Sequence, residues 1–251
     1  MSATILHVDG LVKRFGGLAA TDGATLDVRA GEVHALIGPN GAGKTTLIHQ
    51  IAGSLAPDAG RIVFDGADVT ALPMAKRVHA GLARSYQITN VFGRLPVLDN
   101  LALAVQARSG GSLRFWRPAR SERARYDEAA AVAERVGLAA RLGRLANELS
   151  HGEQRQLEVG LALATNPKLL LLDEPMAGMG PDETARLLAL LQSLRGGGLT
   201  LVLVEHDMDV VFRLADRIST LVSGRVIACG TPDEIRAHPD VRRAYLGDEI
   251  A

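Results

Sequence analysis

A glycine-rich segment that ends in one lysine carries the clearest chemical signal in the chain. Residues 38–46 read Gly-Pro-Asn-Gly-Ala-Gly-Lys-Thr-Thr and fit the spacing G-x-x-x-x-G-K-[ST]. Glycines let successive backbone N–H groups converge on phosphate oxygens, and a following helix points its positive end at them. Lys44 supplies charge for the β- and γ-phosphates of a nucleotide, and Thr45 offers a hydroxyl to Mg²⁺. The predicted nucleotide-binding residues of this segment are Gly38, Pro39, Asn40, Gly41, Ala42, Gly43, Lys44, Thr45 and Thr46.

A plain glycine turn between a strand and a helix is the alternative interpretation of this segment. The pattern lies after a predicted strand and before a predicted helix, as a phosphate-binding loop requires. This context favours nucleotide binding.

Two carboxylates follow an apolar run further along the chain. Residues 169–174 read Leu-Leu-Leu-Leu-Asp-Glu, which predicts a buried strand with Asp173 and Glu174 at its carboxyl end, where ligands collect in parallel sheets. Asp173 can hold Mg²⁺ directly or through water, and Glu174 can polarise an attacking water molecule. A strand that runs into a charged turn explains the segment equally well alone, but the upstream phosphate loop favours the catalytic interpretation.

A third segment, residues 149–154, reads Leu-Ser-His-Gly-Glu-Gln and precedes a predicted helix over residues 152–165. Ser150 and Glu153 have the spacing of a capping box, in which each side chain satisfies a backbone N–H of the other residue. A capped helix N-terminus is also an anion site, so the structural and functional interpretations are compatible.

The elements that must position these residues alternate along the chain. Apolar patterns predict strands over residues 4–8, 24–28, 32–37, 61–64, 82–86, 168–172 and 199–204, and a hairpin over 217–222 and 225–228. Helical patterns cover residues 44–52, 152–165, 182–194 and 207–214. This alternation predicts an α/β fold with a mostly parallel sheet covered on both faces. Helical periodicity also fills about residues 97–150, which we expect to form an inserted α-helical subdomain.

Composition restricts the class of protein. The 251 residues are 47% hydrophobic and 22% charged, with 28 basic and 28 acidic residues, so disorder is excluded and nucleic acid is not an expected partner. The apolar runs are too short to span a bilayer, and the N-terminus has no signal-peptide pattern, so we expect a soluble intracellular protein. A single cysteine, Cys229, excludes an intramolecular disulfide.

One segment departs from this charge balance. Residues 108–125 hold six arginines and one glutamate, a local charge of +5. A solvated face is one interpretation, and contact with acidic lipid head groups or an acidic partner surface is the other.

Taken together, these motifs resemble the nucleotide-binding subunit of ATP-binding cassette (ABC) transporters over essentially the whole chain. In this family pattern residues 38–46 are the Walker A loop, 169–174 are Walker B and 149–154 resemble the signature motif. The resemblance implies a P-loop NTPase core with an N-terminal antiparallel β portion, in a single domain over residues 1–251. It also implies roles for further residues: adenine stacking by Phe15, Mg²⁺ sensing and catalysis by Gln87, a switch function for His206, and nucleotide contact by Ser150, Gly152 and Glu153.

A narrower resemblance points to the ATPases of branched-chain amino acid uptake, and to the longer of their two subunits. It rests on the helical insertion and on residues 18–22, 177–178, 230–235 and 244–247. The ATPases of urea or amide import and of lipopolysaccharide export are the alternatives within the family. The resemblance implies ATP and Mg²⁺ as cofactors and a cytoplasmic location, peripheral on the inner face of the cell membrane. The implied partners are integral-membrane permease subunits, a second ATPase subunit that is identical or paralogous, and, indirectly, a periplasmic or extracellular substrate-binding protein.

Some residues depart from the family pattern. His151 replaces the usual first glycine of the signature, Glu153 stands where the short motif has glutamine, and Gly180 and Met179 replace common residues of the D-loop. We expect the signature to function despite these changes.

Two other functions compete with transport. A cassette protein acting on ribosomes or DNA usually carries two cassettes or long coiled coils, and this chain has neither. A small-molecule kinase would leave residues 149–154 and His206 without a role.

The stretch after Gln87 is rich in apolar residues. It suits a groove that binds a permease helix through Val91, Phe92 and Leu95, or it packs the helical insertion onto the main sheet.

Overall fold

The computed structural model describes residues 3–85, 91–108 and 119–246. Its main sheet has six strands in the order β10-β9-β3-β8-β7-β6. All neighbouring pairs are parallel except the β9–β10 hairpin. The predicted α/β fold with a mostly parallel sheet is therefore confirmed. The strands are β3 (Val33–Ile37), β6 (Leu82–Arg84), β7 (Leu169–Asp173), β8 (Thr200–Val204), β9 (Arg217–Val222) and β10 (Arg225–Gly230).

A second, antiparallel sheet is built from the N-terminal part of the chain, in the order β2-β1-β4-β5. The first two strands are more than twice as long as the sequence predicts. Their pairing shifts register several times, and Gly10 and Gly23 adopt positive φ angles. These irregularities interrupt the alternation of apolar side chains from which strands are predicted. The strands are β1 (Thr4–Phe15), β2 (Leu18–Arg29), β4 (Ala59–Phe64) and β5 (Ala67–Asp68).

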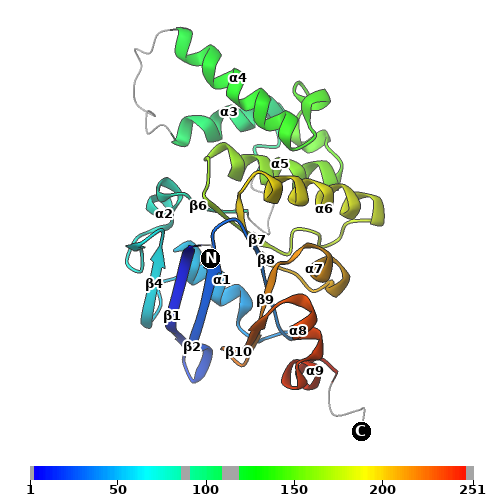
Figure 1. Cartoon of the computed structure of the whole chain (residues 1–251). Helices are drawn as coiled ribbons and strands as arrows, with labels where there is room; N and C mark the ends of the chain where they lie inside the picture. The colour runs from blue at the N-terminus through cyan, green and yellow to red at the C-terminus, as the bar shows by residue number, and fades with distance from the viewer. Residues whose placement is uncertain (1–2, 86–90, 109–118, 247–251) are drawn as a thin grey trace.

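Helices cover the main sheet on both faces (Figure 1). The four helices predicted individually, α1, α5, α6 and α7, begin and end within two residues of the predicted bounds. Helices α2, α8 and α9 are too short to show a clear period in the sequence. Strand β6 ends at Arg84, before the end of the predicted strand 82–86. The α-helices are α1 (Lys44–Ala52), α2 (Met74–Ala80), α3 (Val97–Arg108), α4 (Ala119–Arg135), α5 (His151–Ala164), α6 (Pro181–Gly196), α7 (Met208–Leu214), α8 (Pro232–Ala237) and α9 (Pro239–Leu246), and the 3₁₀ turns are η1 (Ala139–Arg141) and η2 (Ala146–Glu148).

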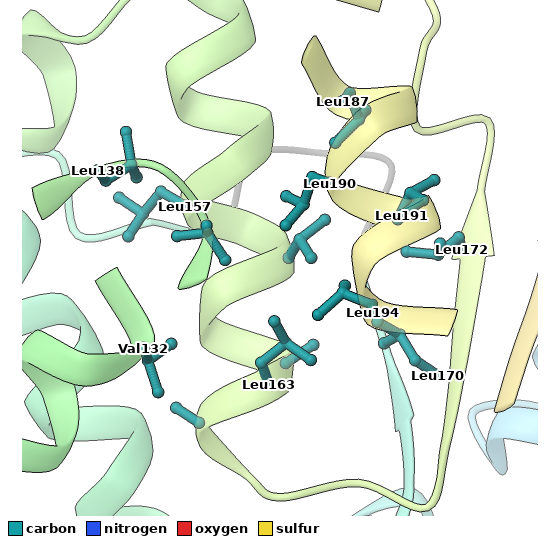
Figure 2. Packing of buried hydrophobic residues seen from close by; sticks show 14 of the residues in the cluster. Val132, Leu138, Leu157, Leu163, Leu170, Leu172, Leu187, Leu190, Leu191 and Leu194 are labelled. Atoms are coloured by element: carbon teal, nitrogen blue, oxygen red, sulfur yellow. The ribbon is translucent and has the colours of Figure 1, made fainter. Parts of the chain in front are cut away.

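The run of four leucines in β7 shows why the strand is continuously apolar. Leu170 and Leu172 pack with leucines of α5 and α6 on one face (Figure 2). Leu169 and Leu171 face the opposite way and join the cluster that contains Leu47 of α1 and the antiparallel sheet. A strand buried on both faces needs apolar residues at every position, because its side chains alternate between the faces.

Helices α3 and α4 pack on each other and on α5 (Figure 1). They lie within the stretch of residues 97–150 that is expected to be helical. In the part of the chain that the structure describes, no helix is both long and apolar enough to cross a membrane.

Candidate active site

The glycine-rich loop connects β3 to the N-terminus of α1 and is held very close to neighbouring backbone. A Cβ atom added to Gly43 would lie 2.0 Å from the carbonyl oxygen of Ala20, and Gly43 has a φ of 101°. A Cβ added to Gly38 would lie 2.1 Å from the carbonyl oxygen of Leu221. Only glycine fits at these two positions, because any larger residue would collide with neighbouring backbone.

Lys44 and Thr45 begin helix α1 directly after this loop. The Nζ atom of Lys44 donates hydrogen bonds to the carbonyl oxygens of Gly38, at 2.6 Å, and Pro39, at 3.1 Å. Burial lowers the pKa of Lys44, while the carboxylates of Glu174 and Asp173 act in the opposite direction. Thr45 is exposed, so its hydroxyl is accessible to a ligand.

Helix α1 has no side-chain cap. Its N-cap position is Gly43, which carries no side-chain oxygen to accept the first backbone N–H groups. An uncapped helix start after a glycine loop presents donors and a positive dipole end to an anion. The predicted phosphate-binding residues thus converge on one helix N-terminus.

Asp173 lies buried at the carboxyl end of β7. Its Oδ2 atom accepts a hydrogen bond from Nη2 of Arg84, at 2.9 Å, in a buried ion pair. Its Oδ1 atom is buried and has no hydrogen-bond partner among the described residues. Burial raises the pKa of Asp173, and Arg84 lowers it. An unsatisfied buried carboxylate oxygen fits a hard cation such as Mg²⁺, which prefers oxygen ligands.

Glu174 follows directly and adopts a positive φ of 47°. Such a conformation is strained for a residue other than glycine and concentrates at functional sites. Oε1 of Glu174 lies 2.8 Å from Nε2 of His206, which comes after the neighbouring parallel strand β8. The fold therefore brings together two predicted catalytic residues that are 32 positions apart in the sequence.

Two charged residues beside this pair were not predicted from the sequence. Arg84 binds Asp173 as described, and Glu205 is buried next to His206. Glu205 accepts hydrogen bonds from the backbone N–H groups of Met176, at 3.0 Å, and His206, at 3.2 Å. Burial raises the pKa of Glu205. The position of Glu205 at the end of an apolar strand is the one signal that could have identified it.

The predicted capping box at the start of α5 is present. Ser150 Oγ accepts a hydrogen bond from the N–H of Glu153 at 3.3 Å, and Glu153 Oε2 accepts one from the N–H of Ser150 at 3.0 Å. The other oxygen of Glu153 accepts a hydrogen bond from Nε of Arg141 at 2.7 Å. Arg141 also lowers the pKa of Glu153. The carboxylate of Glu153 is therefore committed to contacts within the chain.

The start of α5 stands apart from the phosphate loop. No hydrogen bond or ion pair among the described residues joins positions 150–153 to positions 38–46. The exposed ring of Phe15 lies at the end of β1, with Nζ of Lys13 5.9 Å from its centroid. Gln87, the remaining predicted site residue, lies outside the described residues.

Three features define the class of P-loop nucleoside triphosphatases. They are a glycine loop before an uncapped helix, two carboxylates at the end of a parallel strand, and a histidine after the neighbouring strand. The family profile described as ABC transporter matches residues 21–177. The profile described as branched-chain amino acid ATP-binding cassette transporter matches residues 225–251. The chain belongs to the ABC transporter ATP-binding family, and it is an ATPase.

Curated relatives match over almost the full length. The high-affinity branched-chain amino acid transport ATP-binding protein LivG of Salmonella typhimurium is 40% identical, with 99% of this chain and 100% of the relative covered. The corresponding protein BraF of Pseudomonas aeruginosa is 41% identical over the same shares. The lipopolysaccharide export system ATP-binding protein LptB of Haemophilus influenzae is 32% identical, with 98% and 99% covered.

Solved structures agree with the fold. The crystal structure of a nucleotide-free ATP-binding cassette from an ABC transporter superposes with a TM-score of 0.86 at 32% identity, and covers 98% of this chain and 100% of that one. An ATP-binding cassette in its ADP conformation gives a TM-score of 0.85 at the same identity and coverage.

Proposed function

We propose that this chain is the ATP-hydrolysing subunit of an importer for branched-chain or chemically related amino acids. The match of residues 225–251 to the branched-chain amino acid transporter profile carries this proposal. The relatives named for branched-chain amino acid transport are also more similar to the chain than LptB is, at 40% and 41% against 32% identity.

In this function the loop of residues 38–46 binds the phosphates of ATP, with Lys44 neutralising charge on the γ-phosphate. Glu174 accepts the proton of the attacking water, and His206, hydrogen-bonded to Glu174, orients that carboxylate. Thr45 and Asp173 would hold Mg²⁺, together with Gln87. Bound Mg²⁺ would neutralise charge on the β- and γ-phosphates.

Three further residues complete the proposed nucleotide site. Phe15 stacks on adenine, and Ser150 and Gly152 contact the nucleotide of a second ATPase subunit. Two subunits, identical or paralogous, then enclose two ATP molecules between the phosphate loop of one and the signature helix of the other.

Residues 97–150 form the proposed helical subdomain of this single ATPase domain. The packing of α3 and α4 on each other and on α5 supports that division.

Permease docking is the second part of the proposed function. A groove of about 430 Å³ runs between α2 and the C-terminal ends of α3 and α5. An adjoining hollow of about 210 Å³ shares Val78, Arg84 and Thr165 with it. The lining is mostly apolar, which suits a short helix of a permease that lies against the face of the ATPase.

Residues 91–95, which the sequence analysis considers as a docking surface, lie outside the lining of this groove. Val91 and Leu95 are partly buried, and neither they nor Phe92 line the groove. The side chain of Phe92 is 61% exposed, so it does not pack the helical insertion onto the sheet.

Reconstitution with permeases and a binding protein that are found to be co-transcribed with this chain tests the substrate. We expect ATP-dependent uptake of leucine, isoleucine and valine into proteoliposomes. Uptake of urea or amides in their place would overturn the amino-acid proposal while leaving the ATPase assignment intact.

Substitutions in the groove test the docking. Val78→Asp should abolish uptake while leaving basal ATPase and stability of the isolated subunit unchanged. Phe92→Ser tests residues 91–95 separately, and loss of uptake in this variant with normal uptake in Val78→Asp would favour docking there. Ile227→Asp, at an exposed apolar residue on β10, is the matched control. Normal uptake by the Val78→Asp complex would contradict the proposed docking groove.

A further inference from the structure

A carboxylate from helix α6 occupies the start of α5, which we call the signature helix because it begins within the signature residues 149–154. Oε1 of Glu183 accepts a hydrogen bond from the backbone N–H of Gly152 at 3.0 Å, and Oε2 accepts one from the N–H of Gly180 at 3.4 Å. Gly152 is in the first turn of α5, and Gly180 is the N-cap of α6. One side chain therefore bridges the N-termini of two helices.

This contact depends on glycine at position 152. A Cβ atom added there would lie 2.8 Å from Oε1 of Glu183 and 3.0 Å from its Cβ. A second link lies beside it, because Nε2 of His151 is 3.3 Å from the carbonyl oxygen of Ala177. The Glu183 link joins the first turn of α5 to the first turn of α6, and the His151 link joins it to the segment that connects β7 to α6.

The charges support an ionised carboxylate in this position. The N–H of Gly152 is the main cause that lowers the pKa of Glu183, and Gly180, His151 and Arg186 act in the same direction. A carboxylate at a helix N-terminus is stabilised by the helix dipole. The N–H of Glu153 is already taken by Ser150. In the lone subunit, the N–H groups of Gly152 and Glu153 therefore already have acceptors.

We propose that Glu183 is an internal substitute for phosphate that opposes closure of the ATPase dimer. This inference rests on the proposed function, in which the γ-phosphate bound by one subunit meets the signature helix of the other. To reach the N–H of Gly152, that phosphate must displace the Glu183 carboxylate, since two anions cannot share one donor at close range. Glu183 sets the ATP concentration at which the dimer forms, and takes no part in the hydrolysis step.

The test measures dimer formation against ATP concentration in a Glu174→Gln background, by light scattering after gel filtration. The chain is used alone and with any second ATPase subunit that co-purifies with it. Adding Glu183→Gln replaces a charge-assisted hydrogen bond by a neutral one and removes the repulsion. We expect the ATP concentration for half-maximal dimerisation to fall about fivefold.

Asp182→Asn is the matched control, because it removes the same charge from the exposed neighbouring position in the same helical turn. We expect no change in dimerisation for this variant. In the nucleotide-free subunit, hydrogen exchange at the amide of Gly152 should become faster for Glu183→Gln and stay the same for Asp182→Asn.

The other possible results separate a failure of this inference from a failure of the proposed function. Equal or weaker dimerisation of Glu183→Gln would overturn the inference and leave Glu183 as a structural link between α5 and α6. A Glu174→Gln parent that stays monomeric in ATP, with or without its partner subunit, would overturn the proposed function and the inference with it. If Glu183→Gln fails to fold, Glu183→Asp keeps the charge but withdraws it from Gly152, and the same decrease in ATP concentration is expected.

Discussion

The N-termini of α1 and α5 are two proposed anion sites, and they differ in how their backbone N–H groups are satisfied. Helix α1 begins after Gly43, with no side-chain cap and with exposed Thr45 in its first turn. Helix α5 begins at a capping box, and the N–H of Gly152 is bound by Glu183.

This difference shows which site is complete without a ligand. The start of α1 has no side-chain cap, and the nearby Asp173 leaves one buried oxygen unsatisfied among the described residues. At the start of α5, the N–H groups of Gly152 and Glu153 are bound by the side chains of Glu183 and Ser150 of the same subunit. Nucleotide should therefore bind first at α1, and should reach α5 only by competing with an internal carboxylate.

The first prediction tests whether ATP hydrolysis depends on the α1 side, by which we mean residues 38–46 together with Asp173, Glu174 and His206. Glu174→Gln keeps the size of the side chain but cannot accept the proton of water. We expect ATP hydrolysis to fall by about 10²–10⁴-fold, while ATP binding is retained and an ATP-dependent dimer persists. Phosphate release and equilibrium binding of a fluorescent ATP analogue measure the two effects. A fully active variant would place the base elsewhere, with His206 as the next candidate.

The second prediction removes the main charge at the α1 site. Lys44→Ala should weaken MgATP binding by roughly 10–100-fold, because charge-assisted hydrogen bonds to phosphate are lost. The fold should remain, since Lys44 contacts only two loop carbonyl groups through its amine in the described structure. Calorimetric titration measures the affinity, and circular dichroism verifies the fold. Wild-type affinity in this variant would show that the nucleotide lies elsewhere.

The third prediction tests the backbone shape of the glycine-rich loop, residues 38–46, independently of the charge of Lys44. Gly43→Ala should destabilise the subunit by roughly 3 kcal/mol, because the added Cβ meets backbone and φ is positive. Gly41→Ala is the control, since its φ is also positive but the space around it is open. We expect the control to cost about 1 kcal/mol. Equal losses of unfolding free energy in urea would contradict the close backbone approach at Gly43.

The α1 side could be predicted from the sequence because its signals are local. The glycine loop occupies nine consecutive residues, and the leucine run of β7 is buried on both faces. A short window of sequence contains the whole pattern in each case. The pairing of Glu174 with His206 required only that the carboxyl ends of adjacent parallel strands meet.

The α5 side could be predicted only in part. The capping box is local and was correct, but the contact between Gly152 and Glu183 joins residues 31 positions apart on two packed helices. The pair of Arg84 and Asp173 spans 89 positions. Such contacts depend on how the elements pack, and no periodicity within either element encodes them. Strands β1 and β2 exceeded their predicted lengths for a related reason, since bulges are set by pairing with a partner strand.

The smallest expected effect concerns the cap of α5. Ser150→Ala removes the oxygen that accepts the N–H of Glu153, and should lower the free energy of unfolding by about 1 kcal/mol. Thr231→Ala removes an equivalent cap from α8, where the hydroxyl accepts the N–H of Glu234, and should cost a similar amount. The two variants should differ in function. Ser150→Ala weakens ATP-dependent dimerisation in the Glu174→Gln background, because the signature helix loses an oxygen at its proposed contact with nucleotide, whereas Thr231→Ala leaves dimerisation unchanged. Urea unfolding and light scattering measure the two properties, and equal dimerisation of both variants would mean that Ser150 serves the helix alone.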